Sequence, residues 1–253
     1  MSPHRATRRG VFITLEGPEG AGKTTQAERL RDALAATGAE VVLTREPGGT
    51  GLGERVREVL LAVAAGVPHD PRADALLFNA ARAQLVAEVI RPALDRGAVV
   101  ISTRFADSTV AYQGYGAGLP IDELRAIEWI ATGGLRPDRT ILLDLPAATG
   151  LGRKGAGELT RFETAFDVAF HERVRAGFLA LAAAEPERFV VVDSARPEDA
   201  VAADILAAVA PALPSGEERS GVPGPSPPVG ATTRPPRPAP PRAPPRARPV
   251  RRR

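Results

Sequence analysis

The chain has 253 residues, of which 43% are hydrophobic, so it is long enough to bury a full core. It contains no cysteine, which excludes disulfides, thiolate metal sites and a cysteine nucleophile. No apolar run reaches membrane-spanning length, and residues 1–10 lead into a predicted strand without an apolar leader segment, so we expect a cytoplasmic protein with no membrane contact.

The positive charge is concentrated at the C-terminus. Residues 211–253 contain nine Arg, two Glu and 14 Pro, a net charge of +7, which leaves −4 for residues 1–210 of the total of +3. Such a composition cannot build a core, so we expect one domain over 1–210 and a disordered Pro/Arg-rich tail over 211–253. Contact of the tail with nucleic acid is the less favoured interpretation, because the body lacks the basic excess of a nucleic-acid-binding domain.

Apolar strands alternate with helical patterns along the body. The first strand is Val11–Glu16, and the first helix runs from Thr24 to Thr37 after a Gly-rich segment. Further strands are predicted at 40–44, 99–102, 140–144 and 189–193, and further helices at 52–64, 72–95, 121–132, 147–153, 163–184 and 197–210. Trp129 is expected in the core. The alternation predicts an α/β fold, a five-stranded parallel sheet with helices on both faces.

The segment between the first strand and the first helix reads GPEGAGKTT and fits the pattern G-x-x-x-x-G-K-[ST] in full. Its glycines allow backbone N–H groups to turn around a phosphate, and the helix adds its positive N-terminal end. Lys23 is one of only two lysines among 33 basic residues, which indicates that a compact ammonium is needed there for the β and γ phosphates. The Thr24 hydroxyl is placed to ligate Mg²⁺. The predicted ATP site comprises Gly17, Pro18, Glu19, Gly20, Ala21, Gly22, Lys23, Thr24 and Thr25.

Four further segments turn this loop into a specific hypothesis. They are Arg45–Thr50 (REPGGT), Phe78–Gln84 (FNAARAQ), Thr103–Gly114 (TRFADSTVAYQG) and Phe170–Phe178 (FHERVRAGF). Together with the loop they resemble the thymidylate kinase family over about 11–210. The resemblance implies a P-loop kinase fold with a mobile lid at about 147–163, and phosphoryl transfer from ATP to dTMP in dTTP biosynthesis. It also implies a homodimer, with helices 72–95 and 121–132 as candidate interface elements.

The resemblance also implies the residues that bind dTMP. Phe78 stacks on thymine, Arg82 donates to a base carbonyl, and Thr109 and Gln113 complete the edge of the base. Tyr112 packs under the sugar and crowds out a 2′-hydroxyl. Taken alone, Phe78 is equally consistent with core packing, and Arg82 and Arg104 with surface ion pairs. The predicted dTMP-binding residues are Arg45, Phe78, Arg82, Arg104, Thr109, Tyr112, Gln113 and Glu163.

The resemblance implies that the catalytic cation comes either from the loop or from the mobile lid. Phosphoryl transfer needs positioning and charge stabilisation rather than a general base. Residues 18–21 contain no basic side chain, which points to the lid, where Arg153, Lys154 and Arg161 are the candidates. Together with Lys23 and Arg104, these three are the predicted catalytic residues.

Two positions depart from the family pattern, because Thr103 and Thr160 stand where Asp is usual. They leave Glu16, Glu19 and Glu163 as the anionic groups near the phosphates, so the activity or the metal geometry is expected to differ.

Two other functions remain open from the sequence. The chain is alternatively another nucleoside monophosphate kinase, acting on dUMP, CMP or a purine nucleotide. A nucleotide-switched binding protein that acts through its basic tail is the second alternative.

Overall fold

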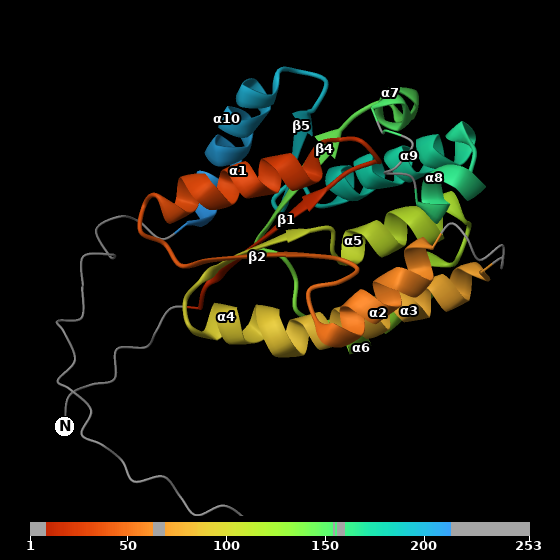
Figure 1. The fold of residues 1–253 in the computed structure, drawn as a ribbon, viewed down its shortest axis with the longest axis horizontal. Coiled ribbons are helices and arrows are strands. Elements are labelled where there is room, and N and C mark those ends of the chain that lie inside the picture. Colours follow the sequence, from red (N-terminus) through yellow and green to blue (C-terminus); the bar gives the residue numbers. More distant parts are fainter. Residues whose placement is uncertain (1–8, 63–68, 154, 156–159, 214–253) are drawn as a thin grey trace, which may run out of the picture. The chain divides into compact units, whose positions relative to one another are not determined.

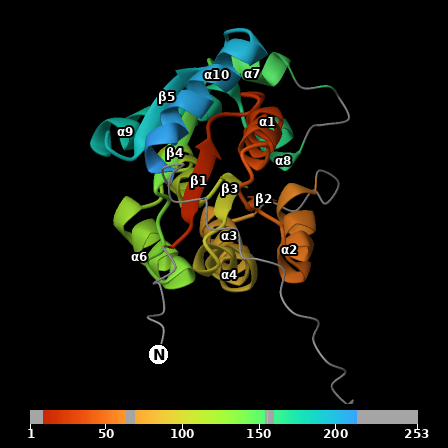
Figure 2. The same ribbon diagram turned by 90° about the vertical axis from the view of Figure 1, so that its left-hand side faces the viewer.

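A five-stranded parallel sheet organises the structure, a computed structural model that describes residues 9–62, 69–153, 155 and 160–213. The strand order is β2-β3-β1-β4-β5. Figure 1 labels β1, β2, β4 and β5, and Figure 2 labels every strand of the sheet in this order. The strands are β1 (Val11–Glu16), β2 (Val41–Arg45), β3 (Val99–Thr103), β4 (Arg139–Asp144) and β5 (Phe189–Asp193). The predicted parallel α/β fold is confirmed, and β1 and β5 match their predicted ranges.

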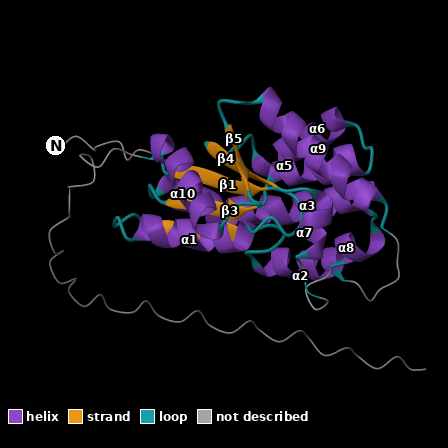
Figure 3. Ribbon diagram, turned by 90° about the horizontal axis from the view of Figure 1, so that it is seen from above, coloured by secondary structure: helices purple, strands orange, loops and turns teal. Residues whose placement is uncertain are grey.

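Helices cover both faces of this sheet (Figures 2 and 3). They are α1 (Lys23–Ala35), α2 (Gly51–Leu61), α3 (Pro71–Leu85), α4 (Arg91–Asp95), α5 (Ala106–Thr109), α6 (Ile121–Thr132), α7 (Ala147–Gly152), α8 (Arg161–Ala165), α9 (Val168–Ala184) and α10 (Glu198–Val209). Among the described residues, no helix is long and apolar enough to cross a membrane.

The two faces of β1 show why the sheet is packed on both sides. Successive side chains of a strand point to opposite faces. Ile13 and Leu15 pack with residues of α1 and α10, whereas Phe12 packs with residues of α3 and α4 on the other side. All six residues of β1 are buried, as expected for the central strand of a sheet covered by helices. The carboxyl end of this strand leads directly into the Gly-rich loop.

The helix predicted over 72–95 is one helical stretch with an altered centre. α3 ends at Leu85, a π-helical segment, η1 (Val86–Ile90), follows, and α4 completes the stretch. Pro92 has no N–H and cannot donate to the Glu88 carbonyl, so the α-helical ladder is interrupted one turn before this proline.

The helix predicted over 163–184 is two helices. Phe166 is extended, with φ −119° and ψ 143°, and the Asp167 side chain accepts a hydrogen bond from Phe170 N at the start of α9. Asp167 is therefore the N-cap of a second helix, α9, within a stretch whose apolar pattern predicted one continuous helix.

The expected burial of Trp129 was wrong, and the predicted elements omitted two helical segments. Trp129 is 67% exposed on α6 and does not lie in the core. No element was predicted for residues 106–116, which form α5 and the π-helical segment η2 (Val110–Gly116). This stretch is rich in Ala and Gly, so it carries no apolar periodicity, and it is stabilised by packing against α9.

The described part of the chain ends at Leu213. A short 3₁₀ helix, η4 (Ala210–Ala212), follows α10, and Ala212 and Leu213 pack against the core. The remaining predicted tail, 214–253, lies outside the described residues and stays a prediction.

Candidate functional site

A cavity of about 900 Å³ lies at the carboxyl ends of β1 and β3. It is lined on one side by the Gly-rich loop and the start of α1, and on the other by residues of α2, α3, α5, η2 and α8. Open parallel sheets bind ligands at this edge. The predicted donor loop and the predicted acceptor segments therefore meet in one space.

The loop presents backbone donors and a lysine to the cavity. α1 begins at Lys23, its N-cap Gly22 has φ 82° in the left-handed region, and no side chain caps the helix. The first N–H groups of the helix are therefore left for an anion. Lys23 Nζ donates to Gly17 O at 3.0 Å and to Pro18 O at 2.6 Å, which holds the ammonium over the loop.

The loop is packed closely against α7, at the root of the predicted lid. A Cβ at Gly20 would lie 2.0 Å from Gly150 O, and a Cβ at Gly150 would lie 2.0 Å from Glu19 O. Glycine at both positions allows this backbone contact. The donor loop and the start of the lid segment are thereby in direct van der Waals contact.

Arg104 lies between the donor loop and the acceptor side. Its φ of 68° is the one positive φ of a non-glycine residue in the described part of the chain. Such a conformation is strained and is held here by hydrogen bonds from Arg104 N to Leu15 O and from Ser102 Oγ to Arg104 O. The strand end is thus bent to aim the side chain into the cavity.

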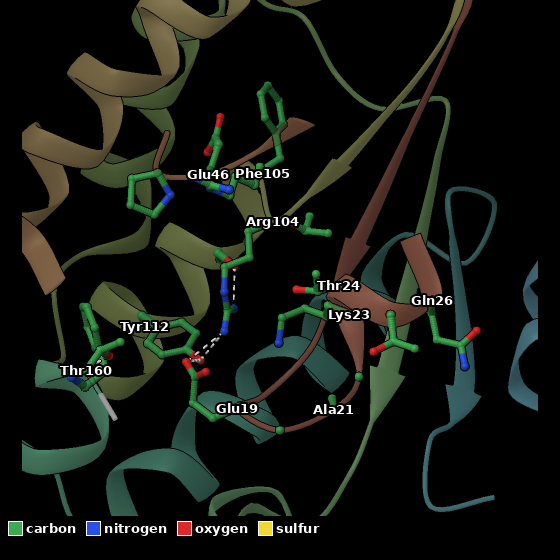
Figure 4. Close-up of a pocket in the computed structure, with 18 of the residues that line it drawn as sticks. Glu19, Ala21, Lys23, Thr24, Gln26, Glu46, Arg104, Phe105, Tyr112 and Thr160 are labelled. Carbon is green, nitrogen blue, oxygen red and sulfur yellow. Dashed lines mark hydrogen bonds and ion pairs between the residues drawn. The ribbon is translucent and has the colours of Figure 1, made fainter. Parts of the chain in front are cut away.

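The Arg104 guanidinium bonds to groups from both sides of the cavity (Figure 4). It donates to Gly17 O at 3.2 Å, to Glu19 Oε1 at 2.8 Å and to the Tyr112 hydroxyl at 3.0 Å. The Tyr112 hydroxyl in turn donates to Glu19 Oε1 at 2.7 Å. Although burial opposes it, the interactions with Tyr112, Glu19 and Glu16 raise the pKa of Arg104, so it remains a fixed cation.

Two further arginines face the same part of the cavity. Arg45 donates to Glu54 at 3.1 Å, and Arg57 donates to Pro47 O at 2.9 Å. Burial, followed by repulsion from Arg45, lowers the pKa of Arg57. Positive charge is therefore concentrated between Arg45, Arg57 and Arg104. Arg57 was not predicted from the sequence, because nothing in the local pattern of its helix distinguishes it from other helical residues.

Arg82 forms the polar floor of the acceptor side. It is 1% exposed and donates from Nε to Glu46 Oε2 at 2.9 Å, from Nη1 to Asn79 Oδ1 at 3.0 Å, and from Nη2 to Phe105 O and to Thr109 Oγ1, each at 3.1 Å. These bonds use four of the five guanidinium N–H groups.

Gln113 lines the cavity beside Arg82, and its Oε1 is buried without a hydrogen-bond partner among the described residues. Because an unsatisfied buried acceptor is costly, a ligand N–H is the expected partner. One arginine N–H and one amide oxygen thus remain for a ligand.

Three aromatic rings wall this side. The ring centroids of Phe78 and Phe162 are 6.1 Å apart. The rings of Phe162 and Tyr112 are perpendicular to each other, with centroids 5.6 Å apart. All three line the cavity. Phe162, on α8, was missed in the sequence, where only the neighbouring charged residues were considered. The rings give this side of the cavity an apolar aromatic wall, against which a planar base can pack.

The three candidate lid cations are placed differently. Arg153 lines the cavity and donates to Ser194 O at 3.2 Å and to Gly20 O at 3.4 Å. Arg161 is absent from the cavity lining and pairs with Asp74 instead. Lys154 lies outside the described residues. The geometry therefore favours Arg153 as the cation near the donor loop.

A family model for thymidylate kinase matches residues 15–205 of this chain. The chain belongs to the thymidylate kinase family. It is accordingly an ATP-dependent kinase. The predicted membership is confirmed.

Individual relatives agree with this result. The thymidylate kinase of Deinococcus radiodurans is 58% identical over 201 residues, which cover 79% of this chain and 96% of the relative. A Pseudomonas fluorescens thymidylate kinase is 56% identical over 189 residues, which cover 74% and 89%. The crystal structure of thymidylate kinase from Ehrlichia chaffeensis superposes with a TM-score of 0.64 at 33% identity, covering 79% of this chain and 98% of the other.

The structure gives the local role of Thr160, one of the two positions where this family member departs from the usual Asp. The Thr160 side chain caps α8, accepting from Phe162 N at 3.3 Å, while Glu163 accepts from Thr160 N at 2.5 Å. This is a capping box, and Thr and Asp are both N-cap residues. Glu163 also lines the cavity. The other departure, Thr103, lines the cavity at the end of β3.

Glu16 is fully buried behind the site in this thymidylate kinase family member. It accepts from Phe105 N at 2.7 Å and from Ser108 Oγ at 2.6 Å. Burial, with a smaller contribution from Asp107, raises the pKa of Glu16 to about 7. It is not part of the cavity lining, so it supports the segment after Arg104 rather than facing the phosphates directly.

Proposed function

We propose that this chain transfers the γ-phosphoryl group of ATP to dTMP, forming ADP and dTDP in nucleotide biosynthesis. The observation that carries the proposal is the single cavity of about 900 Å³ that joins the phosphate-binding loop to a pocket with aromatic walls, one buried arginine and one unpartnered amide oxygen. The names of the relatives, all thymidylate kinases, support the same acceptor.

On the donor side, the triphosphate lies along the loop. Its oxygens replace the Gly17 and Pro18 carbonyls as acceptors for Lys23 Nζ, and backbone N–H groups at the start of α1 bind the phosphates. The cavity continues past Arg153 to Ser194 and Arg196, which leaves space for the adenine base.

The residues of the donor loop fit Mg²⁺ carried by ATP. Among the described residues, no cluster of three or more His, Asp or Glu side chains is arranged to hold a metal. Mg²⁺ is usually held by one or two protein ligands together with substrate phosphates and water, and the Thr24 hydroxyl lines the cavity. When bound, Mg²⁺ neutralises charge on the phosphate oxygens.

On the acceptor side, the base lies between the aromatic rings and the Arg82 floor. Arg82 donates its remaining N–H to a thymine carbonyl, and Gln113 Oε1 accepts the N3–H of the base. The Arg45, Arg57 and Arg104 group holds the acceptor phosphate. Both nucleotides are thereby fixed so that an acceptor oxygen faces the γ phosphorus in line.

The transfer step breaks the bond between the γ phosphorus and the β–γ bridging oxygen of ATP and forms a bond from that phosphorus to a dTMP phosphate oxygen. The leaving oxygen becomes part of ADP. Lys23 and Arg153 stabilise the charge that spreads over the transferred group. No described side chain needs to take a proton, because the attacking phosphate oxygen is already ionised.

A homodimer and a cytoplasmic location are also proposed. Leu76 of α3 is 59% exposed, and Trp129 and Ile130 of α6 are 67% and 73% exposed. α3 and α6 pack against each other, so apolar side chains on both helices are available to a second copy. A cytoplasmic location fits the use of ATP and a nucleoside monophosphate.

The test is an ADP-release assay of the full chain with ATP, Mg²⁺ and a panel of monophosphates. dTMP is expected to be the best acceptor. dUMP lacks only a methyl group, worth about 1–3 kcal/mol, so it should be weaker but active. CMP should be poorer still, because its amino group would face the Arg82 donor. A higher rate with CMP than with dTMP would contradict the proposal.

A further inference from the structure

The short helix α8 carries Phe162 and Glu163 to the acceptor side of the cavity. A helix of five residues is not stable by itself, because forming its first turn costs more than its few hydrogen bonds return. Its position must therefore be fixed by contacts to its neighbours. Two of these contacts are made by the side chain of Arg161, the first residue of α8.

Arg161 points away from the cavity and into a polar contact with α3 and α2. Its Nη2 donates to Asp74 Oδ2 at 2.7 Å, and its Nε donates to Leu60 O at 3.1 Å. The side chains of Arg161 and Asp74 are 11% and 4% exposed. The other carboxylate oxygen of Asp74 bonds to His69 Nδ1 at 2.7 Å. Asp74 is thus engaged on both oxygens and does not line the cavity.

A second contact joins α8 to α9. His171 of α9 is 1% exposed, and its Nε2 lies 3.1 Å from Phe162 O. α8 is therefore attached to α3 by Arg161 and to α9 through the Phe162 backbone. Phe162, between the two attachments, has its ring against Phe78 and Tyr112 and is 5% exposed.

We propose that Asp74 and Arg161 are positioning residues for the acceptor base: their ion pair holds α8 so that the Phe162 ring closes the aromatic wall of the cavity. The pair acts through Phe162 and touches neither nucleotide. A guanidinium committed to Asp74 and Leu60 O is not available to the transferred phosphoryl group, so Arg161 is separated from the catalytic cations. The inference rests on the proposed dTMP kinase activity.

The experiment compares Asp74→Asn and Arg161→Met with Arg175→Met in the full-length protein. Arg175 forms a pair of similar length with Asp144, at 2.8 and 2.9 Å, and neither residue lines the cavity. For each variant, kcat and the KM values for dTMP and ATP are measured, together with calorimetric binding of dTMP without ATP.

Both variants of the α8 pair should raise the KM and the calorimetric Kd for dTMP about tenfold, the size of a lost contact between packed residues. The KM for ATP should stay within about twofold, and Arg175→Met should match the wild type. The double variant should be no worse than the single ones, because both changes remove one interaction. Asp74→Glu, which keeps the carboxylate, should recover part of the dTMP affinity.

Three results would overturn the inference. One is a fall in kcat of about 10³-fold or more for Arg161→Met with normal dTMP affinity, as for a catalytic arginine. Another is normal dTMP affinity in Asp74→Asn. The third is normal dTMP affinity in Phe162→Leu, which leaves the ion pair intact and serves if the other variants do not fold. If the wild type itself does not bind or phosphorylate dTMP, the proposed function fails instead.

Discussion

Removing the charge of Glu46 tests how the acceptor floor is stabilised. Glu46 and Arg82 side chains are 4% and 1% exposed, and Arg82 Nε donates to Glu46 Oε2 at 2.9 Å. Glu46→Gln keeps the shape but leaves the guanidinium without a counter-charge. Breaking a buried pair costs about 3–5 kcal/mol. Arg82 keeps its bonds to Asn79, Phe105 and Thr109, so we expect the lower end, about 3 kcal/mol.

The measurement is the thermal unfolding midpoint, Tm, of the full chain, followed by circular dichroism. It is made at pH 8 because burial raises the pKa of Glu46, an effect that Arg82 opposes. A loss of about 3 kcal/mol corresponds to a fall in Tm of about 6–12 °C for a domain of this size. The control is Glu40→Gln, whose partner Arg96 lies at 3.1 Å with both side chains 54% exposed. Such a surface pair is worth about 0–1 kcal/mol. A Glu46→Gln effect no larger than this control would refute the reasoning.

Three further predictions concern the loop and the base. Burial raises the pKa of Glu16 from 4.5 to about 7. The stabilisation that protonated Glu16 provides is therefore complete below about pH 4.5 and is lost as the pH rises through 7. The total free energy lost is about 3 kcal/mol. Urea midpoints of Glu16→Gln between pH 5 and 8 should therefore be flatter than those of the wild type, and parallel curves would contradict this. Lys23→Ala should abolish turnover in the ADP-release assay and leave calorimetric dTMP binding nearly unchanged. Phe78→Ala should raise the KM for dTMP, and an unchanged KM would make Phe78 an ordinary core residue.

Features that depend on neighbours in the sequence could be predicted. The loop is contiguous, so its spacing and the flanking apolar patterns predicted that it joins a strand to a helix beginning at Thr24. In the structure the helix begins one residue earlier, at Lys23. Phe78 and Arg82 are four residues apart on one helix, and both line the cavity. In such cases the geometry of a single element carries the information.

Features that depend on contacts between elements could not be predicted. Phe162 and Arg57 reach the cavity only because α8 and α2 pack around it, and nothing in their local patterns distinguishes them from other helical residues. Arg161 was grouped with the lid cations by its position in the chain, but its direction depends on Asp74, which is 87 residues away. Tertiary contacts decide these positions.

The helix α6 shows how an apolar pattern can be ambiguous. Its buried residues are Leu124, Glu128 and Thr132, which recur every four residues on one face. Trp129 and Ile130 lie on the other face, so apolar residues occur on both sides and the sequence does not say which side is covered.

The exposure of Trp129 has a practical consequence, because it is the only tryptophan in the chain. It lies on α6 and is not part of the cavity lining, so the indole emission of this protein does not report directly on nucleotides entering the site. Its emission instead senses whatever covers the outer face of α6. If a second copy covers α6 as proposed, optical experiments that follow tryptophan measure that association, and nucleotide titrations need a label placed near Tyr112.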